Sequence, residues 1–433
     1  MEYPVSVFWF RRDLRLTDNH GLFKALSSNT KILPVFIFDS HILDELPATD
    51  RRVNFIYRSI QKLQDDLKRK NRELMVYHGD PVLVFENLFA QYPIQAIYTN
   101  HDYEPYAAQR DAQIEQLARK HRAEFYSFKD QVIYEKGEIS KPDGTPYKVF
   151  TPYAKVWKSR LGAEGIPYWP SEKLLENLLP DVSVKMPSLE EMNFKPLDFD
   201  YPLTDLVPGL LKNYSKTRNY PAMDATTRLG IHLRFGTLSV REAVKAALLY
   251  SETWLNELIW REFFMQILYA YPQVTHQSFK PVYDRIPWRN EQSEFERWKQ
   301  GTTGFALVDA GMRELVQTGF MHNRVRMVTA SFLTKHLLID WRWGEAWFAL
   351  HLLDYELSSN NGNWQWAAGS GCDAAPYFRI FNPMEQAAKF DAGQEYIRKW
   401  IPEFNTSAYP KPMIDHAMAR ERCLKTYNQT LKA

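Results

Sequence analysis

Residues 322–383 decide how the second half of this chain is interpreted, and they read HNRVRMVTASFLTKHLLIDWRWGEAWFALHLLDYELSSNNGNWQWAAGSGCDAAPYFRIFNP. Tryptophans are crowded among the aliphatic runs, at Trp341, Trp343, Trp347, Trp364 and Trp366. The last two flank Gln365 and follow the polar run NNGN at residues 360–363. Because Asn and Gly adopt left-handed backbone angles at low cost, this run predicts a turn that ends a helix. The aromatic pair behind that turn is then placed to line a pocket.

This stretch and an earlier one resemble the flavin-binding domain of the photolyase/cryptochrome superfamily. The segments that carry the resemblance are HNRVRM, SSNNGNWQW and FRIFNP, together with WLNELIWREFF at residues 254–264. The resemblance is closest to the class I cyclobutane pyrimidine dimer (CPD) DNA photolyases. It runs from FWFRRDLRLTDNHGL near the N-terminus to about residue 404. It implies an FAD cofactor and light-driven DNA repair.

Length and composition limit the possible classes of protein. A chain of 433 residues exceeds what one hydrophobic core usually serves, so we expect two domains. No apolar run reaches transmembrane length, and the N-terminal apolar run precedes its arginines, which reverses the order of a secretory signal. Cys372 and Cys423 are too few for a disulfide framework and lack zinc spacing. The sequence therefore predicts a cytoplasmic protein with no membrane span and no structural metal.

The total charge gives no sign of a nucleic-acid partner. The 54 Lys and Arg residues nearly balance the 52 Asp and Glu residues, for a formal net charge of +2. A DNA-binding protein of this composition needs a local basic patch, which the total charge cannot reveal. Aromatic residues are more prominent, at 15% with 13 tryptophans, and a large helical core explains them at least as well as a pocket does.

The N-terminal part of the chain alternates between strand-like and helix-like segments. Apolar runs at residues 5–10, 31–39, 73–80 and 95–104 predict strands, and helical spacing marks residues 11–26 (capped by Thr17 or Asp18), 51–70, 81–91 and 105–121. Such alternation predicts an α/β domain with a doubly wound, Rossmann-like parallel sheet. Ligands of such sheets lie beyond the carboxyl ends of the strands, where residues 101–104 fall. No G-x-G-x-x-G motif occurs there, so we expect no dinucleotide in this domain.

Three regions are predicted along the chain. Residues 1–135 form the α/β domain, which the resemblance makes an antenna-chromophore domain. Residues 136–207 form an extended interdomain connection, because the sequence from about Gly162 becomes rich in proline and loses its periodicity. Residues 208–433 carry helical patterns without a convincing strand, so we expect an all-α domain that binds FAD and DNA.

Residues 224–230, DATTRLG, predict an anion site at the start of a helix. Threonine hydroxyls beside exposed backbone N–H groups bind anions, although simple helix capping explains the same residues. By resemblance, the pyrophosphate of FAD is held by Thr226, Thr227, Arg228, Leu229 and Gly230, with Tyr214 covering the cofactor. Many family members have Ser where this chain has Gly230, so one hydroxyl contact is lost or replaced by the backbone.

One broad face of a predicted helix carries Trp254, Glu257, Trp260 and Arg261. Glu257 and Arg261 have the i,i+4 spacing of a surface ion pair worth about 0.3–0.5 kcal/mol. Burying a carboxylate between two tryptophans without a partner is energetically unfavourable, however. Buried carboxylates of this kind occur most often at functional sites. By resemblance, Glu257 hydrogen-bonds the dimer, Trp254 and Arg261 border the flavin, and Trp260 stacks on the lesion. The resemblance therefore implies that Glu257 and Arg261 contact both the FAD cofactor and the DNA.

A basic helix is predicted from about His322. Asn323 and Met327 share one face at i,i+4, and a solvated helix with Met as core filler explains this pattern without any ligand. By resemblance, Asn323 and Arg324 lie on the DNA side, Met327 lines the lesion pocket, and Arg326 forms a salt bridge with Asp354. The methionine also favours a CPD enzyme, because (6-4) photolyases differ here and carry a histidine.

The resemblance assigns the remaining site residues. Asp354, Tyr355 and Glu356 face the flavin, although carboxylates here also suit capping or pairing. Asn360 faces flavin N5, where plant cryptochromes have Asp and animal ones Cys, so it favours repair.

The family's electron relay is matched by Trp288, Trp341 and Trp364, although each alone is typical of a core aromatic residue. Trp260 and Trp366 sandwich the flipped-out dimer, and Arg218 and Gln386 contact the DNA strand.

The resemblance implies that reduced FAD gives an electron to a pyrimidine dimer in damaged DNA, and we expect a monomer. Two alternatives stay open: a blue-light receptor cryptochrome that binds FAD without repair, and a non-catalytic flavin- or nucleotide-binding protein. An antenna in the first domain is a folate, a deazaflavin, a second flavin such as FMN, or absent. Thr275-His276 replaces the Cys-Lys of folate-binding relatives, which leaves Glu104 to hold a folate. Asn363 replaces a Gly common in class I enzymes.

Overall fold

The structure is a computed structural model that describes residues 3–180 and 185–432. It divides into two compact units, each assembled from separate segments of the chain. The sheet unit comprises Met1–Glu135, Ser159–Leu206 and Arg228–Ala246, and the helical unit comprises Lys136–Lys158, Val207–Thr227 and Ala247–Ala433. The three consecutive regions predicted from the sequence do not coincide with these interleaved units. The functions assigned to those regions stay predictions.

Within the described residues, the sheet unit contains five strands in the order β3-β2-β1-β4-β5. These are β1 (Val5–Phe10), β2 (Lys31–Asp39), β3 (Met75–Gly79), β4 (Ile94–Asn100) and β5 (Glu124–Phe128). Every neighbouring pair is parallel. The predicted doubly wound parallel sheet is therefore confirmed, with the strand order reversing between β1 and β4.

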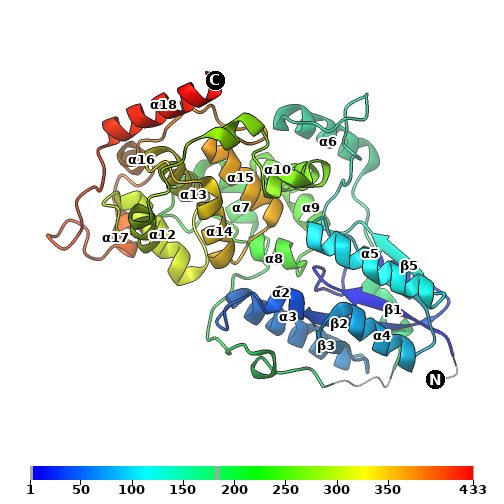
Figure 1. Cartoon of the computed structure of the whole chain (residues 1–433). Coiled ribbons are helices and arrows are strands. Elements are labelled where there is room, and N and C mark those ends of the chain that lie inside the picture. The colour runs from blue at the N-terminus through cyan, green and yellow to red at the C-terminus, as the bar shows by residue number, and fades with distance from the viewer. Residues whose placement is uncertain (1–2, 181–184, 433) are drawn as a thin grey trace. The chain divides into compact units, whose positions relative to one another are not determined.

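Helices cover both faces of this sheet (Figure 1). They are α1 (His20–Leu26), α2 (Ser40–Leu43), α3 (Arg51–Lys68), α4 (Pro81–Gln91) and α5 (Pro105–Lys120). Trp9 of β1 packs against Phe85 of α4, with ring centroids 5.1 Å apart. Phe38 of β2 points to the opposite face, because Trp9 pairs with Val35, and its ring lies 6.3 Å from that of Tyr57 on α3. Both faces need apolar residues, which is why the strands read as continuous apolar runs.

Two details of the N-terminal pattern differ from the prediction. Helix α1 is shorter than the helical spacing of residues 11–26 suggests, and Asn19 rather than Thr17 or Asp18 caps it by accepting from the Leu22 N–H. Asp18 adopts a left-handed φ of 49° and binds Arg241 and Ser239 with its carboxylate. Strand β5 was missed because it is an edge strand whose residues, EFYSF, are exposed or only half-buried and give a weak apolar signal.

A buried ion-pair cluster ties the first and last segments of the sheet unit together. Arg241 of α9 (Val240–Tyr250) donates to Asp18 at 2.9 Å and to Asp130 at 2.8 Å, and Arg15 donates to Asp130 at 2.6 Å. All four side chains are buried. Burial acts to raise the pKa of Asp130, but the charges of Arg15 and Arg241 lower it to about 2. The Asp130 carboxylate therefore stays ionised with its two arginine partners in place.

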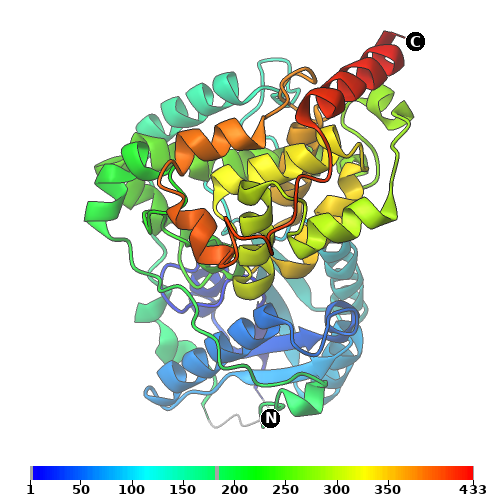
Figure 2. The ribbon, with the colours of Figure 1, turned by 90° about the vertical axis from the view of Figure 1, so that its left-hand side faces the viewer.

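The helical unit is a set of packed helices with a core that includes Trp298, Phe332 and Trp341. Its helices include α10 (Glu252–Ala270), α11 (Gln292–Gln300), α12 (Ala306–Thr318), α13 (Asn323–Ser331), α14 (Trp341–His351), α15 (Leu357–Ala368) and α16 (Pro383–Phe390). Helix α12 packs against α13, α16 and α17 (Glu395–Trp400), as Figure 2 shows, and α15 packs against α10, α13 and α14. None of the described helices combines the length and apolar character needed to cross a membrane.

Helix α15 runs through residues 360–363, so the turn predicted there is wrong. The amides point into the unit instead: Asn360 Nδ2 donates to Glu345 Oε1 at 2.8 Å, and Asn361 Nδ2 donates to the Val274 carbonyl at 3.0 Å. Gly362 lies against the ring of Phe264, which an added Cβ would approach to 2.2 Å. These tertiary contacts outweigh the local preference of Asn and Gly for turns.

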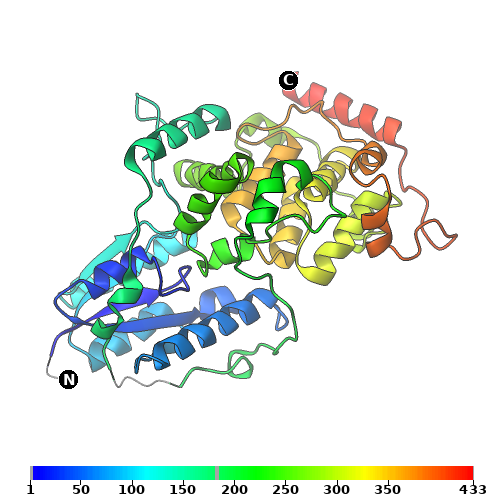
Figure 3. The same ribbon diagram turned by 180° about the vertical axis from the view of Figure 1, so that it is seen from behind.

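The C-terminal helix α18 (His416–Lys432) lies along the outside of the helical unit (Figure 3). Its Tyr427 hydroxyl donates to the carbonyl of Ala368, the last residue of α15, at 3.0 Å. The Lys335 ammonium group donates to the same carbonyl at 2.7 Å and lies 3.9 Å from the centroid of the Tyr427 ring. Burial lowers the pKa of Lys335 to about 7. Helix α18 is therefore tied to the end of α15.

Candidate functional site

Two adjoining cavities lie in the helical unit, and their walls contain most of the predicted site residues. The first has a volume of about 600 Å³, including space open to solvent, and has Arg326, Asp354 and Asn360 in its wall. The second has a volume of about 810 Å³, also including open space, and has Arg218, Glu257 and Trp260 in its wall. Both are lined by Asn323, Met327, Ser359, Asn363 and Trp366. Because the cavities share these residues, a ligand in one would border a ligand in the other.

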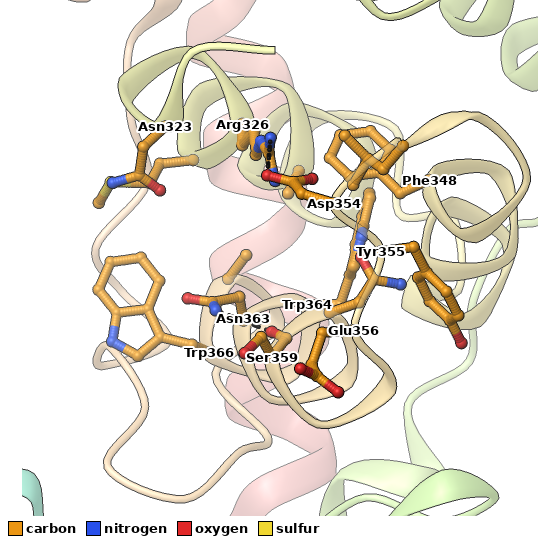
Figure 4. Close-up of a pocket in the computed structure, with 15 residues that line it drawn as sticks. Asn323, Arg326, Phe348, Asp354, Tyr355, Glu356, Ser359, Asn363, Trp364 and Trp366 are labelled. Atoms are coloured by element: carbon orange, nitrogen blue, oxygen red, sulfur yellow. Dashed lines mark hydrogen bonds and ion pairs between the residues drawn. The ribbon is translucent and has the colours of Figure 1, made fainter. Parts of the chain in front are cut away.

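Asp354 and Arg326 form a polar patch on the wall of the first cavity (Figure 4). Arg326 Nη2 donates to Asp354 Oδ2 at 3.0 Å, which is the predicted salt bridge, and Arg326 Nε donates to the Met321 carbonyl at 2.7 Å. The other carboxylate oxygen, Asp354 Oδ1, is buried and has no hydrogen-bond partner among the described residues. An unsatisfied buried oxygen is costly, and a donor on a bound ligand would satisfy it. The N–H and hydroxyl groups of a flavin and its ribityl chain fit this requirement.

Asn360 is held by Glu345, a residue that the sequence did not single out. The Asn360 amide donates to both the Glu345 carboxylate at 2.8 Å and the Glu345 carbonyl at 3.1 Å. Both hydrogens of the amide are thus engaged, which leaves its oxygen to accept from a ligand. Burial raises the pKa of Glu345, and the Asn360 hydrogen bond only partly offsets this effect. Glu345 lies within an aromatic-rich helix, WRWGEAWFALH, which is the same signal that drew attention to Glu257.

Glu257 pairs with Arg218 and not, as its i,i+4 spacing suggested, with Arg261. The Arg218 guanidinium group donates to Glu257 Oε1, and Arg261 Nη2 lies 3.3 Å from Glu356 Oε2. Arg261 therefore joins α10 to the residue that precedes α15. Burial raises the pKa of Glu257, and the charge of Arg218 only partly offsets this. Glu257 is therefore a carboxyl group whose charge is only partly compensated by its partner.

Trp260 and Trp366 both lie in the wall of the second cavity, as a sandwich around a ligand requires. Both indoles are half-buried. Trp366 and Asn323 lie on the same side of the first cavity in the view of Figure 4, with Tyr355 on the other side. The structure thus brings together Glu257, Trp260, Met327 and Trp366 around one space.

Arginines gather beside the second cavity. Arg324 donates to Asn219 Oδ1 at 2.7 Å, and its guanidinium carbon lies 4.4 Å from the centroid of the Phe390 ring. Burial lowers the pKa of Arg324, and the positive charges of Arg218 and Arg379 lower it further. Such a cluster of like charges is a local basic patch of the kind that total charge cannot reveal. Gln386, another predicted DNA contact, is half-buried on α16.

The three predicted relay tryptophans share one region of the helical core. Trp341 and Trp364 are almost fully buried in a single core cluster, and the half-buried Trp288 packs against it. Trp364 also lies in the wall of the first cavity. Its position depends on Gly344, because an added Cβ there would come within 2.1 Å of the Trp364 ring. Their role in electron transfer stays a prediction.

Other predicted cofactor contacts do not lie in the walls of these two cavities. Thr226 and Thr227 belong to the helical unit, whereas Arg228, Leu229 and Gly230 belong to the sheet unit. Gly230 starts helix α8 (Gly230–Phe235), which has no side-chain cap. Trp254 is buried within α10, and Tyr214 of α7 (Pro208–Thr217) is half-buried with its pKa raised to about 12 by burial and then by Glu257. Their contacts with FAD stay predictions.

Comparison with known proteins identifies the family. A sequence profile described as the FAD binding domain of DNA photolyase matches residues 254–408, and one described as DNA photolyase matches residues 6–171. The deoxyribodipyrimidine photo-lyase of Synechococcus sp. is 34% identical over 100% of this chain and 98% of its own length. The chain belongs to the photolyase/cryptochrome superfamily. The predicted superfamily, fold class and FAD-binding domain are therefore confirmed.

Other members of this superfamily show the same full-length similarity. The photo-lyase of Halobacterium salinarum is 34% identical over 98% of this chain and 99% of its own length. Among solved structures, a class III photolyase from Agrobacterium tumefaciens has a TM-score of 0.89 at 32% identity and covers 100% of this chain and 99% of its own. A cryptochrome from Synechocystis sp. has a TM-score of 0.85 at 28% identity, with coverage of 98% and 100%. The photolyase subclass stays a prediction.

Proposed function

We propose that this chain is a light-dependent DNA repair enzyme that reverses cyclobutane pyrimidine dimers with the help of bound FAD. The observation that supports the proposal most strongly is the pair of adjoining cavities. One has Asp354, with its unsatisfied oxygen, and Asn360 among its lining residues, and the other has Trp260, Trp366 and Glu257. A cofactor and a flat, polar-edged substrate would therefore lie next to each other.

The residues of the first cavity fit the isoalloxazine and ribityl parts of FAD. Asp354 and Asn360 offer oxygen acceptors, and Arg326 fixes the Asp354 carboxylate in place. When bound and reduced, FAD would lend the light-excited electron that opens the cyclobutane ring and would receive it back after the ring splits, while the protein supplies binding, orientation and electrostatics. Glu345 fixes the direction of the Asn360 amide and so decides that this group acts as an acceptor.

The second cavity fits a dimer that has left the DNA helix. Photolyases are among the enzymes that extrude their target nucleotide from the duplex, and stacking on aromatic rings contributes about 1–3 kcal/mol per base. Trp260 and Trp366 are the rings available for this purpose. The Glu257 carboxyl group lies in the same wall and is placed to hydrogen-bond the polar edge of a base. A hydrogen bond of this kind also stabilises negative charge on the dimer.

The basic patch around Arg218, Arg324 and Arg379 fits the phosphates on either side of the lesion. Affinity from phosphate contacts falls steeply with salt and does not depend on base sequence. We therefore propose that this patch provides general affinity for DNA, while the two indoles select the damaged site. The cytoplasmic setting and the monomeric state expected from the sequence stay predictions.

The test is repair of a defined substrate. The full chain, loaded with FAD and reduced, is mixed with an oligonucleotide that contains one thymine dimer and is exposed to blue light. The expected result is light-dependent recovery of the ultraviolet absorbance of the two thymines, with no recovery in the dark. Absence of repair despite bound, reduced FAD would overturn the proposal.

A second candidate is a blue-light receptor, which the similarity to the Synechocystis cryptochrome favours. The two proposals differ in one property of the chain, since a receptor binds FAD and responds to light without restoring the dimer. Asn360 supports the repair enzyme, because the family's plant and animal cryptochromes carry other residues at this position. The repair assay described above decides between the two.

An antenna chromophore remains an expectation. The photolyase from Sulfolobus tokodaii, which is similar to this chain with a TM-score of 0.81 at 32% identity over 99% of this chain and 100% of its own, carries two FAD molecules. Glu104, the expected folate contact, is already engaged in the sheet unit by Arg234 at 2.5 Å and Arg12 at 3.2 Å. We therefore favour a second flavin over a folate. An absorption spectrum of the purified protein tests this choice.

A further inference from the structure

Phe150, the first residue of α6 (Phe150–Glu164), lies flat against the indole of Trp260. The two ring centroids are 3.8 Å apart, and the ring planes differ by 4°. Trp260 and Phe264 belong to the wall of the second cavity and Phe150 does not, so Phe150 contacts the indole from outside this wall. Phe263 meets the same indole edge-on at 5.5 Å, and Phe264 lies at 5.5 Å with a tilt of 30°. Three phenyl rings therefore set the orientation of this indole.

The backbone around Phe150 is fixed by the segment that follows α15. The Phe150 N–H donates to Asp373 Oδ2 at 3.0 Å, and the Cys372 thiol donates to the Lys148 carbonyl at 2.9 Å. Helix α15 carries Trp366, the other indole in the cavity wall. The segment after α15 thus links Phe150, which packs on Trp260, to the helix that carries Trp366. The positions of the two indoles are therefore structurally connected.

Helix α6 is also anchored directly to α10, the helix of Trp260. Trp157 Nε1 donates to Glu262 Oε1 at 2.8 Å, and both side chains are buried. The rings of Tyr153 and Phe263 lie 5.3 Å apart. Gln266 Nε2 donates to the Ile139 carbonyl at 2.7 Å, so the chain before α6 is held as well. These contacts fix Phe150 relative to Trp260 without any contribution from a ligand.

We infer that Phe150 is a positioning residue for lesion recognition, which holds the Trp260 indole in the orientation that offers a flat face to a flipped-out dimer. The inference rests on the proposed repair function. Without Phe150, only Phe263 and Phe264 orient the indole; the indole then has more rotational freedom, and restricting it on binding costs affinity. Undamaged DNA is bound through its phosphates and makes no use of the indole face. The effect of Phe150 is therefore selective for damaged DNA.

The test compares Phe150→Leu and Phe150→Tyr in the full, FAD-loaded chain. Dissociation constants are measured in the dark for a duplex with one thymine dimer and for the same duplex without it. In Phe150→Leu, affinity for the dimer-containing duplex should fall about 3- to 10-fold, as expected for the loss of one aromatic stack, while affinity for intact DNA stays unchanged. Phe150→Tyr keeps the ring and should bind like the wild type. Phe150→Met replaces the Leu variant if that variant does not fold.

A double-mutant cycle checks that Phe150 acts through Trp260. In a Trp260→Leu background, Phe150→Leu should have no further effect on either duplex, because the ring that it positions is gone. Equal losses for both duplexes, or loss of bound FAD, would assign Phe150 a role in folding and overturn the inference. Equal discrimination by Phe150→Leu and the wild type would also overturn it. A wild type that binds both duplexes equally contradicts the repair function itself, so the two failures are distinguishable.

Discussion

Two groups of carboxylates, one in each unit, differ in how completely their charges are paired. In the sheet unit, Asp130 is bound by both Arg15 and Arg241, and its pKa is lowered to about 2. In the helical unit, Glu257 has one partner and a pKa raised by burial, and Asp354 has one oxygen without a partner among the described residues. Saturated carboxylates stabilise a fold, whereas incompletely satisfied ones are available to a ligand. The completeness of charge pairing thus distinguishes the structural cluster around Asp130 from the binding site that contains Glu257 and Asp354.

The largest expected effect is the loss of stability in Asp130→Ala. Removing this carboxylate leaves Arg15 and Arg241 buried without it, which typically lowers the free energy of unfolding by about 3–5 kcal/mol. Denaturant titration followed by circular dichroism measures the change. The exposed Asp198 of the same unit provides the control, since Asp198→Ala should change the free energy by less than about 0.5 kcal/mol. A similar loss in both variants would contradict the comparison.

Asp354→Ala should act on cofactor binding. It removes the oxygen that is left for a ligand donor, so the affinity of the apoprotein for FAD should fall about 10- to 100-fold. Fluorescence titration of FAD measures this. Asp284 forms a similar ion pair with Arg342, at 2.7 Å and with similar exposure, so Asp284→Ala is the matched control. If Asp284→Ala weakens FAD binding as much, the Asp354 oxygen is not a cofactor contact.

Acid should remove the contribution of Asp130 to stability. Its pKa is lowered from 3.8 to about 2 in the folded state, so its ionised form stabilises the fold above about pH 4. This contribution, about 2 kcal/mol, is lost as the pH falls from 4 towards 2. The free-energy difference between wild type and Asp130→Ala should therefore shrink by about this amount between pH 5 and pH 2. A difference that stays constant with pH would show that Asp130 is not held in its ionised form.

Glu257→Gln should have the smallest effect on stability, within about 1 kcal/mol at neutral pH. A carboxyl group whose folded pKa is raised opposes folding when it is ionised, so a neutral amide of the same shape removes that cost. The amide also keeps a hydrogen-bond donor for a dimer. Glu257→Leu, without a donor, should bind dimer-containing DNA about 5- to 100-fold more weakly. A large loss of stability in Glu257→Gln would place Glu257 with the structural carboxylates.

Much of the sheet unit could be predicted from the sequence, because its signals are local. Continuous apolar runs marked β1 to β4, and the helices between them carried clear spacing. The missed strand, β5, lies at the sheet edge, where one side of each residue faces away from the core and the apolar signal is weak. Asn19 was not recognised as a cap because Thr17 and Asp18 offer the same chemistry one or two residues earlier.

Most residues of the site in the helical unit could be predicted from the sequence, but the partners with which they form ion pairs and hydrogen bonds could not. Glu257 and Arg261 have the spacing of an ion pair. Glu257 pairs instead with Arg218, and Arg261 pairs with Glu356, both from other parts of the chain. The polar run at 360–363 suggested a turn, because its contacts with Glu345, Val274 and Phe264 are distant in sequence. Phe150 carried no signal at all, since nothing near it in the chain indicates a stack on Trp260. Long-range contacts of this kind are invisible to local pattern analysis.

The tie between α18 and α15 has a practical consequence for protein engineering. A truncated chain that ends before Tyr427 would remove one of the two donors to the Ala368 carbonyl and the ring that lies beside the Lys335 ammonium group. Purification tags and fusion partners should therefore be joined beyond this tyrosine. Proteolytic trimming of the last helix would loosen the far end of the helix that carries Asn360 and Trp366.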